Sequence, residues 1–245
     1  MTMRIFTGMA AVAILAASGG ALAGPKRIDL APALADPSRP EADRVRDADR
    51  KPAELIAFSG LRKGDKVAEL APGRGYFTRL LSAAVGAKGR VYALAATPHA
   101  DIIALAASHP NVAIVTNPPG EVKAPVPVDI VWTTLNYHDF KNVKVGEGDG
   151  AAAVNAAAFR ALKPGGIYFI VDHQTAAGAG ASQTSTLHRV EGALVRREVE
   201  AAGFRFEAES PLLRHPGDDH SQRVQETGIR GKTDQFVFRF RKPKR

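Results

Sequence analysis

Polar side chains that suit acid–base chemistry follow two separate apolar stretches of the sequence. Asn136, His138 and Asp139 follow the first stretch, and Asp172 and His173 close the second. A histidine whose pKa lies near neutrality could accept a proton from a nucleophile while an aspartate orients its ring. The predicted catalytic residues are accordingly His138, Asp139, Asp172 and His173.

The same residues allow two other interpretations. Histidine and aspartate are common metal ligands, but their spacing here matches no diagnostic metal motif, so the sequence assigns no metal ligand. Alternatively, one or two of these side chains only cap loops or helices. A further histidine, His188, lies at the start of a later helical pattern and could face the same site.

A glycine-rich turn links an apolar stretch to a helical pattern. Residues 67–78 have the sequence V-A-E-L-A-P-G-R-G-Y-F-T. Gly73 and Gly75 permit backbone conformations, and a close approach of a ligand, that a Cβ atom would prevent. The N–H groups at the start of the following helix suit a polar or anionic group of a ligand. Many strand-to-helix turns contain two glycines, so this turn alone does not identify the ligand.

Apolar stretches and helical patterns alternate along the middle of the chain. The predicted strands are residues 66–70, 90–95, 112–116, 129–135 and 166–172, and the predicted helices are residues 76–85, 100–108 and 151–162. Strands that alternate with helices of this length form βαβ units, in which helices cover both faces of a parallel sheet. Ligands bind beyond the carboxyl ends of the strands in such sheets. The polar residues after the fourth and fifth strands should therefore converge at one edge of a crevice.

The two ends of this region have different patterns. Residues 41–58 are helical in pattern with an interruption at Pro52, so we expect one kinked helix or two helices. Near the C-terminus, a helix is predicted over residues 187–202, and strands over 204–210 and 235–240 form an antiparallel pair. We therefore expect an α/β fold: a Rossmann-like, doubly wound, mostly parallel sheet of seven strands with an antiparallel C-terminal hairpin.

The order of the motifs resembles that of the class I S-adenosylmethionine-dependent methyltransferases. The resemblance is carried by E-L-A-P-G-R-G-Y-F-T after the first strand, G-R-V-Y-A in the second, D-I-V-W-T-T-L-N-Y-H-D at the fourth and L-K-P-G-G-I-Y-F-I-V-D-H at the fifth. More narrowly, the chain is similar to a group of predicted exported methyltransferases that share N-Y-H-D and a late segment like I-R-G-K-T-D-Q-F. The resemblance runs from about Asp43 to Pro243, and we assign residues 41–245 to one methyltransferase-like domain.

The resemblance implies that S-adenosylmethionine is the cofactor. It places Glu69 and the turn from Ala71 to Gly75 at the amino-acid end of the cofactor. Asn117 would contact the adenine, and Asn136 would lie where cofactor and substrate meet. The implied cofactor-binding residues are Glu69, Ala71, Pro72, Gly73, Gly75, Tyr76, Asn117 and Asn136.

The implied reaction makes few chemical demands on the protein. Methyl transfer needs in-line positioning of the acceptor and the sulfonium, with removal of a proton where the acceptor is a hydroxyl or an amine. His138 is the candidate base, with Asp139 or Asp172 as its orienting partner. We expect the acceptor to be a small molecule or an envelope-associated molecule.

Two positions depart from the family pattern. Ala71 stands where the pattern has its first glycine. Ala95 ends the second strand where such strands carry an Asp or Glu that accepts hydrogen bonds from both ribose hydroxyls. Each hydrogen bond to a charged acceptor contributes roughly 1.5–3 kcal/mol, so its loss could weaken cofactor binding by about one to two orders of magnitude. The second hypothesis is therefore a non-catalytic or repurposed small-molecule-binding protein on this scaffold, and the third is a metal-assisted hydrolase.

The first 23 residues have the pattern of a cleavable export signal. Arg4 is the only charged residue before Lys26, residues 5–17 are mostly apolar, and A-L-A ends the segment. A positive start, a short apolar region and an A-x-A ending are typical of secretory signals. We expect a mature protein that begins near Gly24, with an extended segment over residues 24–40, no transmembrane segment and a periplasmic or secreted location.

Composition narrows the possible chemistry and partners. The chain has no cysteine, so disulfides, thiol nucleophiles and thiolate metal sites are excluded. The formal net charge is +8, or +7 without Arg4, but the basic residues are scattered except at the C-terminus. Aromatic residues make up only 7% and no nucleic-acid-binding motif is visible, so a solvated basic surface is favoured over nucleic-acid binding.

Overall fold

The structure is a computed structural model that describes residues 28–244 of the 245-residue chain. The predicted signal peptide, residues 1–23, lies outside the described residues. The described part of the predicted extended segment contains a short helix, α1 (Ala31–Leu34), so this part is not wholly extended. Leu30, just before α1, is 4% exposed and belongs to the core, which explains why the segment folds back onto the protein.

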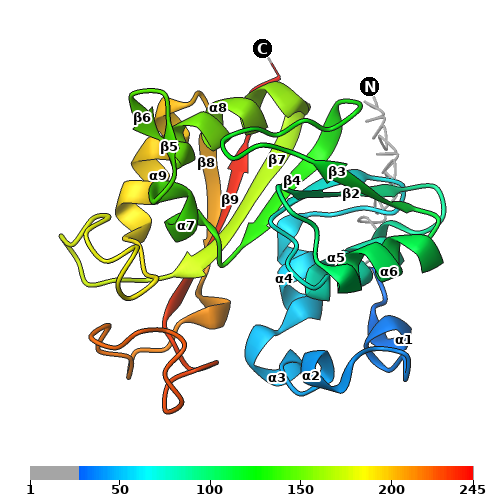
Figure 1. Cartoon of the computed structure of the whole chain (residues 1–245), viewed down its shortest axis with the longest axis horizontal. Coiled ribbons are helices and arrows are strands. Elements are labelled where there is room, and N and C mark those ends of the chain that lie inside the picture. Colours follow the sequence, from blue (N-terminus) through cyan, green and yellow to red (C-terminus); the bar gives the residue numbers. More distant parts are fainter. Residues whose placement is uncertain (1–27, 245) are drawn as a thin grey trace, which may run out of the picture.

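Seven strands form one sheet in the order β3-β2-β1-β4-β7-β9-β8 (Figure 1). They are β1 (Lys66–Leu70), β2 (Arg90–Ala95), β3 (Val112–Thr116), β4 (Val128–Thr134), β7 (Leu162–His173), β8 (Arg205–Ser210) and β9 (Gln235–Arg241). The strands from β3 to β7 in this order run parallel, whereas β9 runs antiparallel to both β7 and β8. The sheet confirms the predicted Rossmann-like fold with its antiparallel C-terminal strands.

Helices cover both faces of the sheet (Figure 1). On one face lie α4 (Pro52–Ser59), α5 (Tyr76–Val85) and α6 (Ala100–Ser108), and on the other lie α8 (Gly150–Ala161) and α9 (Gly192–Ala201). Successive side chains of a strand point to opposite faces of the sheet. Val67 therefore packs in the core beneath α4 and α5, and Ala68 packs in the core beneath α8 and α9. Among residues 28–244, no helix is long and apolar enough to cross a membrane.

Aromatic side chains fill the centre of the α4–α5 face. The ring of Trp132 on β4 is fully buried, with its centroid 4.3 Å from that of Phe169 and 5.3 Å from that of Phe77. Such tilted contacts stabilise the core beyond the area that they bury. Because Trp132 is the single tryptophan of the chain, its fluorescence reports on the unfolding of this core.

Within the βα region, the predicted elements agree with the structure to within one residue except at β7. This strand begins at Leu162 rather than at the predicted residue 166. Leu162 already pairs with Val128 of β4, and the amide of Lys242 donates to the carbonyl of Gly166 at 2.9 Å. Pairing with neighbours on both sides therefore lengthens the strand, and the preceding helix α8 ends at Ala161.

The N-terminal helical region contains three helices, α2 (Glu41–Arg44), α3 (Asp47–Arg50) and α4. The prediction of one kinked helix or two is therefore wrong. Lys51, just before Pro52, has a φ of 43°, which separates α3 from α4. The Asp47 carboxylate accepts a hydrogen bond from the Tyr76 hydroxyl at 2.6 Å and pairs with Arg39 at 2.7 Å. These contacts attach the N-terminal helices to the start of α5.

Two local differences from the predicted elements determine where the histidines lie. A short helix that was not predicted, α7 (Tyr137–Lys141), follows β4 and carries His138, and the small hairpin of β5 (Lys144–Val145) and β6 (Gly148–Asp149) follows it. The predicted helix over residues 187–202 begins only at Gly192. The amide of Val190 donates instead to the carbonyl of His173 at 3.0 Å, so the chain before α9 continues along the end of β7.

The long connection between β8 and β9 begins with a 3-10 turn, η1 (Pro211–Leu213), and then follows an irregular path. A buried ion pair anchors it: Arg189 Nη1 lies 2.8 Å from Asp218 Oδ2, and the two side chains are 0% and 3% exposed. Arg189 also donates to the carbonyls of Gln174 and Gln222, both at 3.0 Å. One arginine therefore joins the connection to the segment that carries His188.

Candidate functional site

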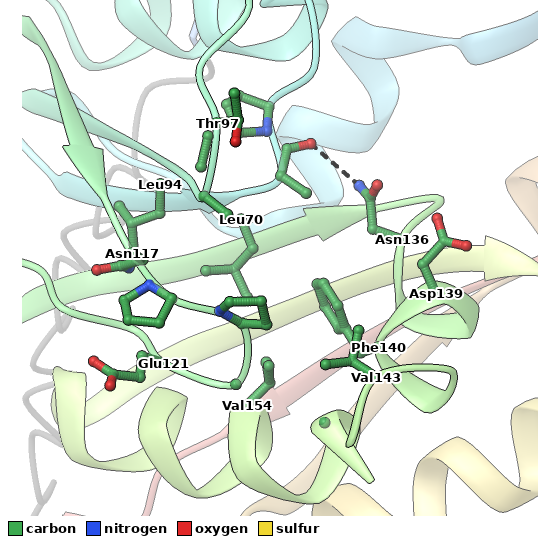
Figure 2. Close-up of a pocket in the computed structure, with 18 of the residues that line it drawn as sticks. Leu70, Leu94, Thr97, Asn117, Glu121, Asn136, Asp139, Phe140, Val143 and Val154 are labelled. Atoms are coloured by element: carbon green, nitrogen blue, oxygen red, sulfur yellow. Dashed lines mark hydrogen bonds between the residues drawn. The ribbon is translucent and has the colours of Figure 1, made fainter. Parts of the chain in front are cut away.

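A pocket of about 490 Å³ lies at the carboxyl ends of β1, β2, β3 and β4 (Figure 2). Its lining comes from the glycine-rich turn, the end of β2, the loop after β3, the segment after β4 and the first turns of α8. The polar and charged lining residues are Thr97, His99, Asn117, Glu121, Asn136 and Asp139. A mostly apolar pocket with a few convergent polar groups, at this place in an open α/β sheet, is the expected position of a ligand.

The two glycines of the turn have different surroundings. Gly73 lines the pocket with a φ of 58°, and a Cβ atom there would meet no protein atom within 4 Å. A Cβ atom on Gly75 would lie 2.8 Å from Ile102 Cδ1 and 2.9 Å from Leu105 Cδ2. Gly73 therefore leaves space on the pocket side, whereas Gly75 allows the turn to pack against α6. Neither Gly75 nor Tyr76 lines the pocket.

Ala71 also lines the pocket and has a φ of 48°. A left-handed conformation costs an L-residue other than glycine roughly 1–2 kcal/mol, which explains why glycine suits this position. The turn is held in place on both sides: the amide of Ala71 donates to the carbonyl of Leu94 at 3.0 Å, and Asn136 Nδ2 donates to the carbonyl of Ala71 at 3.3 Å (Figure 2). Asn136 therefore braces the turn from the pocket side.

Asn117 is the least satisfied polar side chain of the pocket lining. It is 5% exposed, and neither its Nδ2 nor its Oδ1 atom has a hydrogen-bond partner among the described residues. Burying an unpaired polar group costs about 1–3 kcal/mol. Surrounding residues cover both atoms in this structure, so a ligand in the pocket would reach them once that cover shifts, and the amide could then donate one hydrogen bond and accept another.

Glu69, predicted to bind the cofactor, does not line the pocket. Its side chain is buried beneath the turn, where Oε2 accepts a hydrogen bond from the Thr78 hydroxyl at 2.6 Å. Burial raises the pKa of the Glu69 carboxyl from 4.5 to about 7, and the hydrogen bond from Thr78 offsets only part of this rise. Glu69 therefore supports the turn from below.

His138 and Asp172 form a buried pair, as the convergence of β4 and β7 predicts. His138 Nδ1 lies 2.7 Å from Asp172 Oδ1, and the His138 amide donates to Asp172 Oδ2 at 2.8 Å. Burial lowers the pKa of His138, but the charge and the hydrogen bond of Asp172 outweigh this and hold it above its usual value. Asp172 therefore fixes the orientation of the ring, in which Nε2 faces His188 and Asp139.

The outer edge of the His138 ring meets two more polar groups. His138 Nε2 lies 3.3 Å from His188 Nδ1 and 3.4 Å from Asp139 Oδ1. Of these three residues, only Asp139 lines the pocket. His138 itself is 3% exposed, so an acceptor in the pocket would meet Asp139 first.

His173, the fourth predicted catalytic residue, has a different partner. Its Nδ1 lies 2.8 Å from the Thr233 hydroxyl, and its ring centroid is 6.2 Å from that of His138. Burial lowers the pKa of His173 to about 3, so its imidazole is neutral at physiological pH. It does not line the pocket, and its predicted catalytic role has no support from this geometry.

Ala95 lies in the pocket at the end of β2, as the sequence predicts. Asp101, the next acidic residue along the chain, does not line the pocket and lies 3.4 Å from Arg74. Three of the polar and charged lining residues were missed by the sequence analysis: Thr97, His99 and Glu121. Each follows the carboxyl end of a parallel strand, which is the signal that could have identified them.

The sheet order and the pocket at the strand ends define the class I methyltransferase form of the Rossmann-like fold. A S-adenosylmethionine-dependent methyltransferase from Aquifex aeolicus aligns with a TM-score of 0.59 at 18% identity, over 82% of this chain and 95% of that chain. The 1,6-didemethyltoxoflavin-N1-methyltransferase of Burkholderia thailandensis, with bound 1,6-didemethyltoxoflavin and S-adenosylhomocysteine, aligns with a TM-score of 0.53 at 18% identity, over 83% and 79%.

The same fold also occurs in a protein that is named as a cyclase and not as a methyltransferase. The [4+2]-cyclase SpnF aligns with a TM-score of 0.55 at 17% identity, over 80% of this chain and 81% of that chain. At these identities the likeness shows the shared fold alone. No protein-family model matches the sequence, and no curated protein matches it either.

Proposed function

We propose that the protein is an S-adenosylmethionine-dependent methyltransferase that acts on a small-molecule or envelope-associated acceptor. The observation that carries this proposal is the unpaired, buried amide of Asn117 in the pocket lining. A ligand with a neighbouring donor and acceptor would satisfy both of its polar atoms. Adenine has such an edge, because its amino group donates a hydrogen bond and the adjacent ring nitrogen accepts one.

The rest of the pocket suits a ligand that extends away from Asn117. Asn117 and Asp139 lie at opposite ends of the pocket (Figure 2). Between them, the turn at Gly73 leaves space for a close approach to its backbone. We place the adenine at Asn117, the amino-acid end against the turn, and the methyl group toward Asp139.

His138 remains our candidate base, with Asp172 as its orienting partner. Transfer breaks the bond between sulfur and the methyl group, forms a bond from that methyl group to the acceptor oxygen or nitrogen, and releases the acceptor's proton. An acceptor bound beside Asp139 would lie close to His138, because His138 Nε2 is 3.4 Å from Asp139 Oδ1. The proton can then reach His138 through the rim of the pocket.

Calorimetric titration with S-adenosylmethionine and S-adenosylhomocysteine tests this proposal at Ala95. We expect the wild type to bind with a dissociation constant in the tens of micromolar or weaker, about −6 kcal/mol, because β2 ends without a carboxylate. Ala95→Asp should tighten binding by about tenfold to hundredfold, since it restores a charged acceptor. Ala100→Asp adds the same charge at an exposed residue of α6 and should leave affinity unchanged.

Three results would count against the proposal or its details. If none of the three proteins binds either compound, the methyltransferase proposal fails. If Ala95→Asp and Ala100→Asp bind equally well, the added acceptor does not meet a ribose. Nanomolar binding by the wild type would show that another group holds the ribose and that our placement of Ala95 is wrong.

The second candidate is a non-catalytic or repurposed binding protein on the same scaffold. Ala95 favours it, because the strand end that commonly holds the ribose has no carboxylate in this chain. We also propose that the protein is exported, on the pattern of residues 1–23 alone. Export would separate it from a cofactor made in the cytoplasm, which again favours the second candidate.

A further inference from the structure

Three potential metal ligands form a nearly equilateral triangle at the rim of the pocket. His138 Nε2 lies 3.3 Å from His188 Nδ1 and 3.4 Å from Asp139 Oδ1, and His188 Nδ1 lies 3.5 Å from Asp139 Oδ1. A tetrahedral zinc ion with bonds of about 2.0–2.1 Å separates its ligands by about 3.3–3.4 Å. An octahedral ion with bonds of about 2.1 Å separates adjacent ligands by only about 3.0 Å. The triangle matches three corners of a tetrahedral site.

We propose that His138, Asp139 and His188 bind one divalent metal ion, preferentially Zn²⁺, and leave its fourth position open. This inference does not depend on the proposed methyltransferase function. Two imidazoles and one carboxylate are a donor set that zinc uses in catalytic sites. The three residues are 50 positions apart at most in the sequence, and α7 and the segment before α9 bring them together.

The surroundings of His138 orient it as a ligand. Asp172, fully buried, accepts from His138 Nδ1 at 2.7 Å and is itself held by the amides of His138 and His173. The Nδ1 proton is therefore donated to Asp172, and Nε2 keeps a lone pair on the side of the ring that faces His188 and Asp139. A carboxylate behind a histidine in this way is the usual second contact of a metal-bound imidazole.

The backbone of His188 is held in an unfavourable conformation. Its φ is 56°, in the left-handed region that non-glycine residues seldom adopt. The neighbouring residue, Arg189, is completely buried and bonded to Asp218, which holds the segment in place. Strain of this kind persists where surrounding structure enforces it, and it is found most often at functional positions.

One contact competes with the metal. Arg223 Nη2 lies 3.1 Å from His188 Nε2, so without metal the guanidinium donates to Nε2 and the ring proton sits on Nδ1. Metal binding at Nδ1 moves that proton to Nε2, and Arg223 must turn away. Arg223 is exposed and can do so. Removing this arginine should therefore strengthen metal binding.

The fourth position of the ion would face the pocket. The Asp139 side chain is 52% exposed and lines the pocket, whereas the His138 and His188 side chains are 4% and 21% exposed and do not line it. A zinc ion with one open position lowers the pKa of a bound water, hydroxyl or thiol. With the ion in place, His138 serves as a ligand, and the ion takes over the activation of an acceptor.

The experiment uses the full chain without a polyhistidine tag, stripped with a chelator, and Zn²⁺ and Co²⁺ as probes. We expect one ion per chain by elemental analysis, a micromolar or tighter dissociation constant in competition with a chromophoric chelator, and the strong visible bands of tetrahedral Co²⁺. His188→Gln and Asp139→Asn should each weaken Zn²⁺ binding by more than about 100-fold. His215→Gln, a histidine outside the cluster, should bind like the wild type, and Arg223→Gln should bind several-fold more tightly.

Several outcomes would overturn the inference. Wild-type protein that takes up no Zn²⁺ at millimolar concentration has no such site. Equal affinity in the wild type, His188→Gln and Asp139→Asn would show that any bound zinc lies elsewhere, and an octahedral Co²⁺ spectrum would refute the tetrahedral geometry. Circular dichroism of both variants excludes unfolding as the cause of a loss. Zinc binding without S-adenosylmethionine binding would sustain this inference while the proposed function fails, and the reverse result would overturn this inference alone.

Discussion

At the scale of single residues, Gly73 and Gly75 are two positions apart in one turn, yet they have different roles. A side chain on Gly73 would enter open space on the pocket side, while a side chain on Gly75 would collide with α6. Ligand binding and folding can therefore be separated by substitution in this turn.

Gly73→Val should abolish S-adenosylmethionine binding while the protein stays folded. Its two methyl groups would occupy the ligand space, and the left-handed backbone would cost roughly 1–2 kcal/mol of stability. Gly64→Val is the matched control, because Gly64 also has a left-handed φ, 88°, and no atom within 4 Å of a Cβ. Calorimetry and urea unfolding measure the two effects. Unchanged affinity in folded Gly73→Val would mean that the turn has only a structural role.

Glu69 predicts a dependence of stability on pH. Its pKa is about 7 in the folded protein because burial disfavours its charge, against 4.5 in the unfolded chain. The folded state therefore binds this proton more tightly, so the contribution of Glu69 to the free energy of unfolding is highest below about pH 4.5 and falls as the pH rises toward 7. The fall from this group should reach about 3 kcal/mol.

Glu69→Gln cannot ionise and should remove this part of the pH dependence. Urea unfolding followed by Trp132 fluorescence, between about pH 4.5 and pH 8, measures it. Glu54→Gln, at an exposed position of α4, controls for the loss of a carboxyl group. Parallel pH profiles for the wild type and Glu69→Gln would contradict the raised pKa.

At the scale of the elements, the buried pair of Arg189 and Asp218 holds the connection between β8 and β9 against the segment that carries His188. Arg189→Met leaves the Asp218 carboxylate buried without its partner. Breaking a buried ion pair in this way costs about 3–5 kcal/mol, so we expect a large loss of stability. Urea unfolding gives the change in free energy.

Arg197→Met, at an exposed position of α9, is the control and should change stability by less than about 0.5 kcal/mol. If the two variants unfold alike, the ion pair does not anchor the connection. Amide hydrogen exchange measures the local stability of the connection. The amides of residues 214–234 should lose protection in Arg189→Met before those of the sheet.

At the scale of the whole molecule, the proposed export determines whether the protein meets S-adenosylmethionine, which is made in the cytoplasm. Sequencing of the N-terminus of protein from the envelope fraction should give a start near Gly24, because residues 21–23 form an A-x-A cleavage site. Ala23→Asp should block cleavage and leave a longer chain, whereas Ala11→Leu, within the apolar region, should not. Intact Met1 on a soluble cytoplasmic protein would remove both the location and the problem of access to the cofactor.

Much of the fold was predictable because it depends on short-range patterns. Residues 66–70, K-V-A-E-L, and the glycines after them indicate a short strand and its turn without reference to the rest of the chain. The same holds for β2 and β3, whose predicted bounds agree with the structure. Strands of a parallel sheet that helices cover on both faces are rich in apolar residues, so the sequence reveals them even where a strand includes a charged residue such as Glu69.

Other boundaries depend on neighbours that are remote in the sequence. β7 begins four residues early because it pairs with residues of β4 and with the chain after β9. α9 begins five residues late because Val190 bonds to His173 instead of continuing a helix. The helical pattern of residues 187–191 is compatible with both outcomes, and only the tertiary contacts select one.

The sequence by itself determined the alternation of the main strands and helices, the position of the glycine-rich turn and the absence of a carboxylate at Ala95, and it offered Asp139 and Asp172 as alternative partners of His138. Only the tertiary structure decided that Glu69 lies beneath the turn, that Asn117 is buried without a partner and that His188 completes a triangle with His138 and Asp139. The physical reason is the range of the interactions. Periodicity and turn conformation depend on adjacent residues, whereas burial and the distance between two side chains depend on how the whole chain packs.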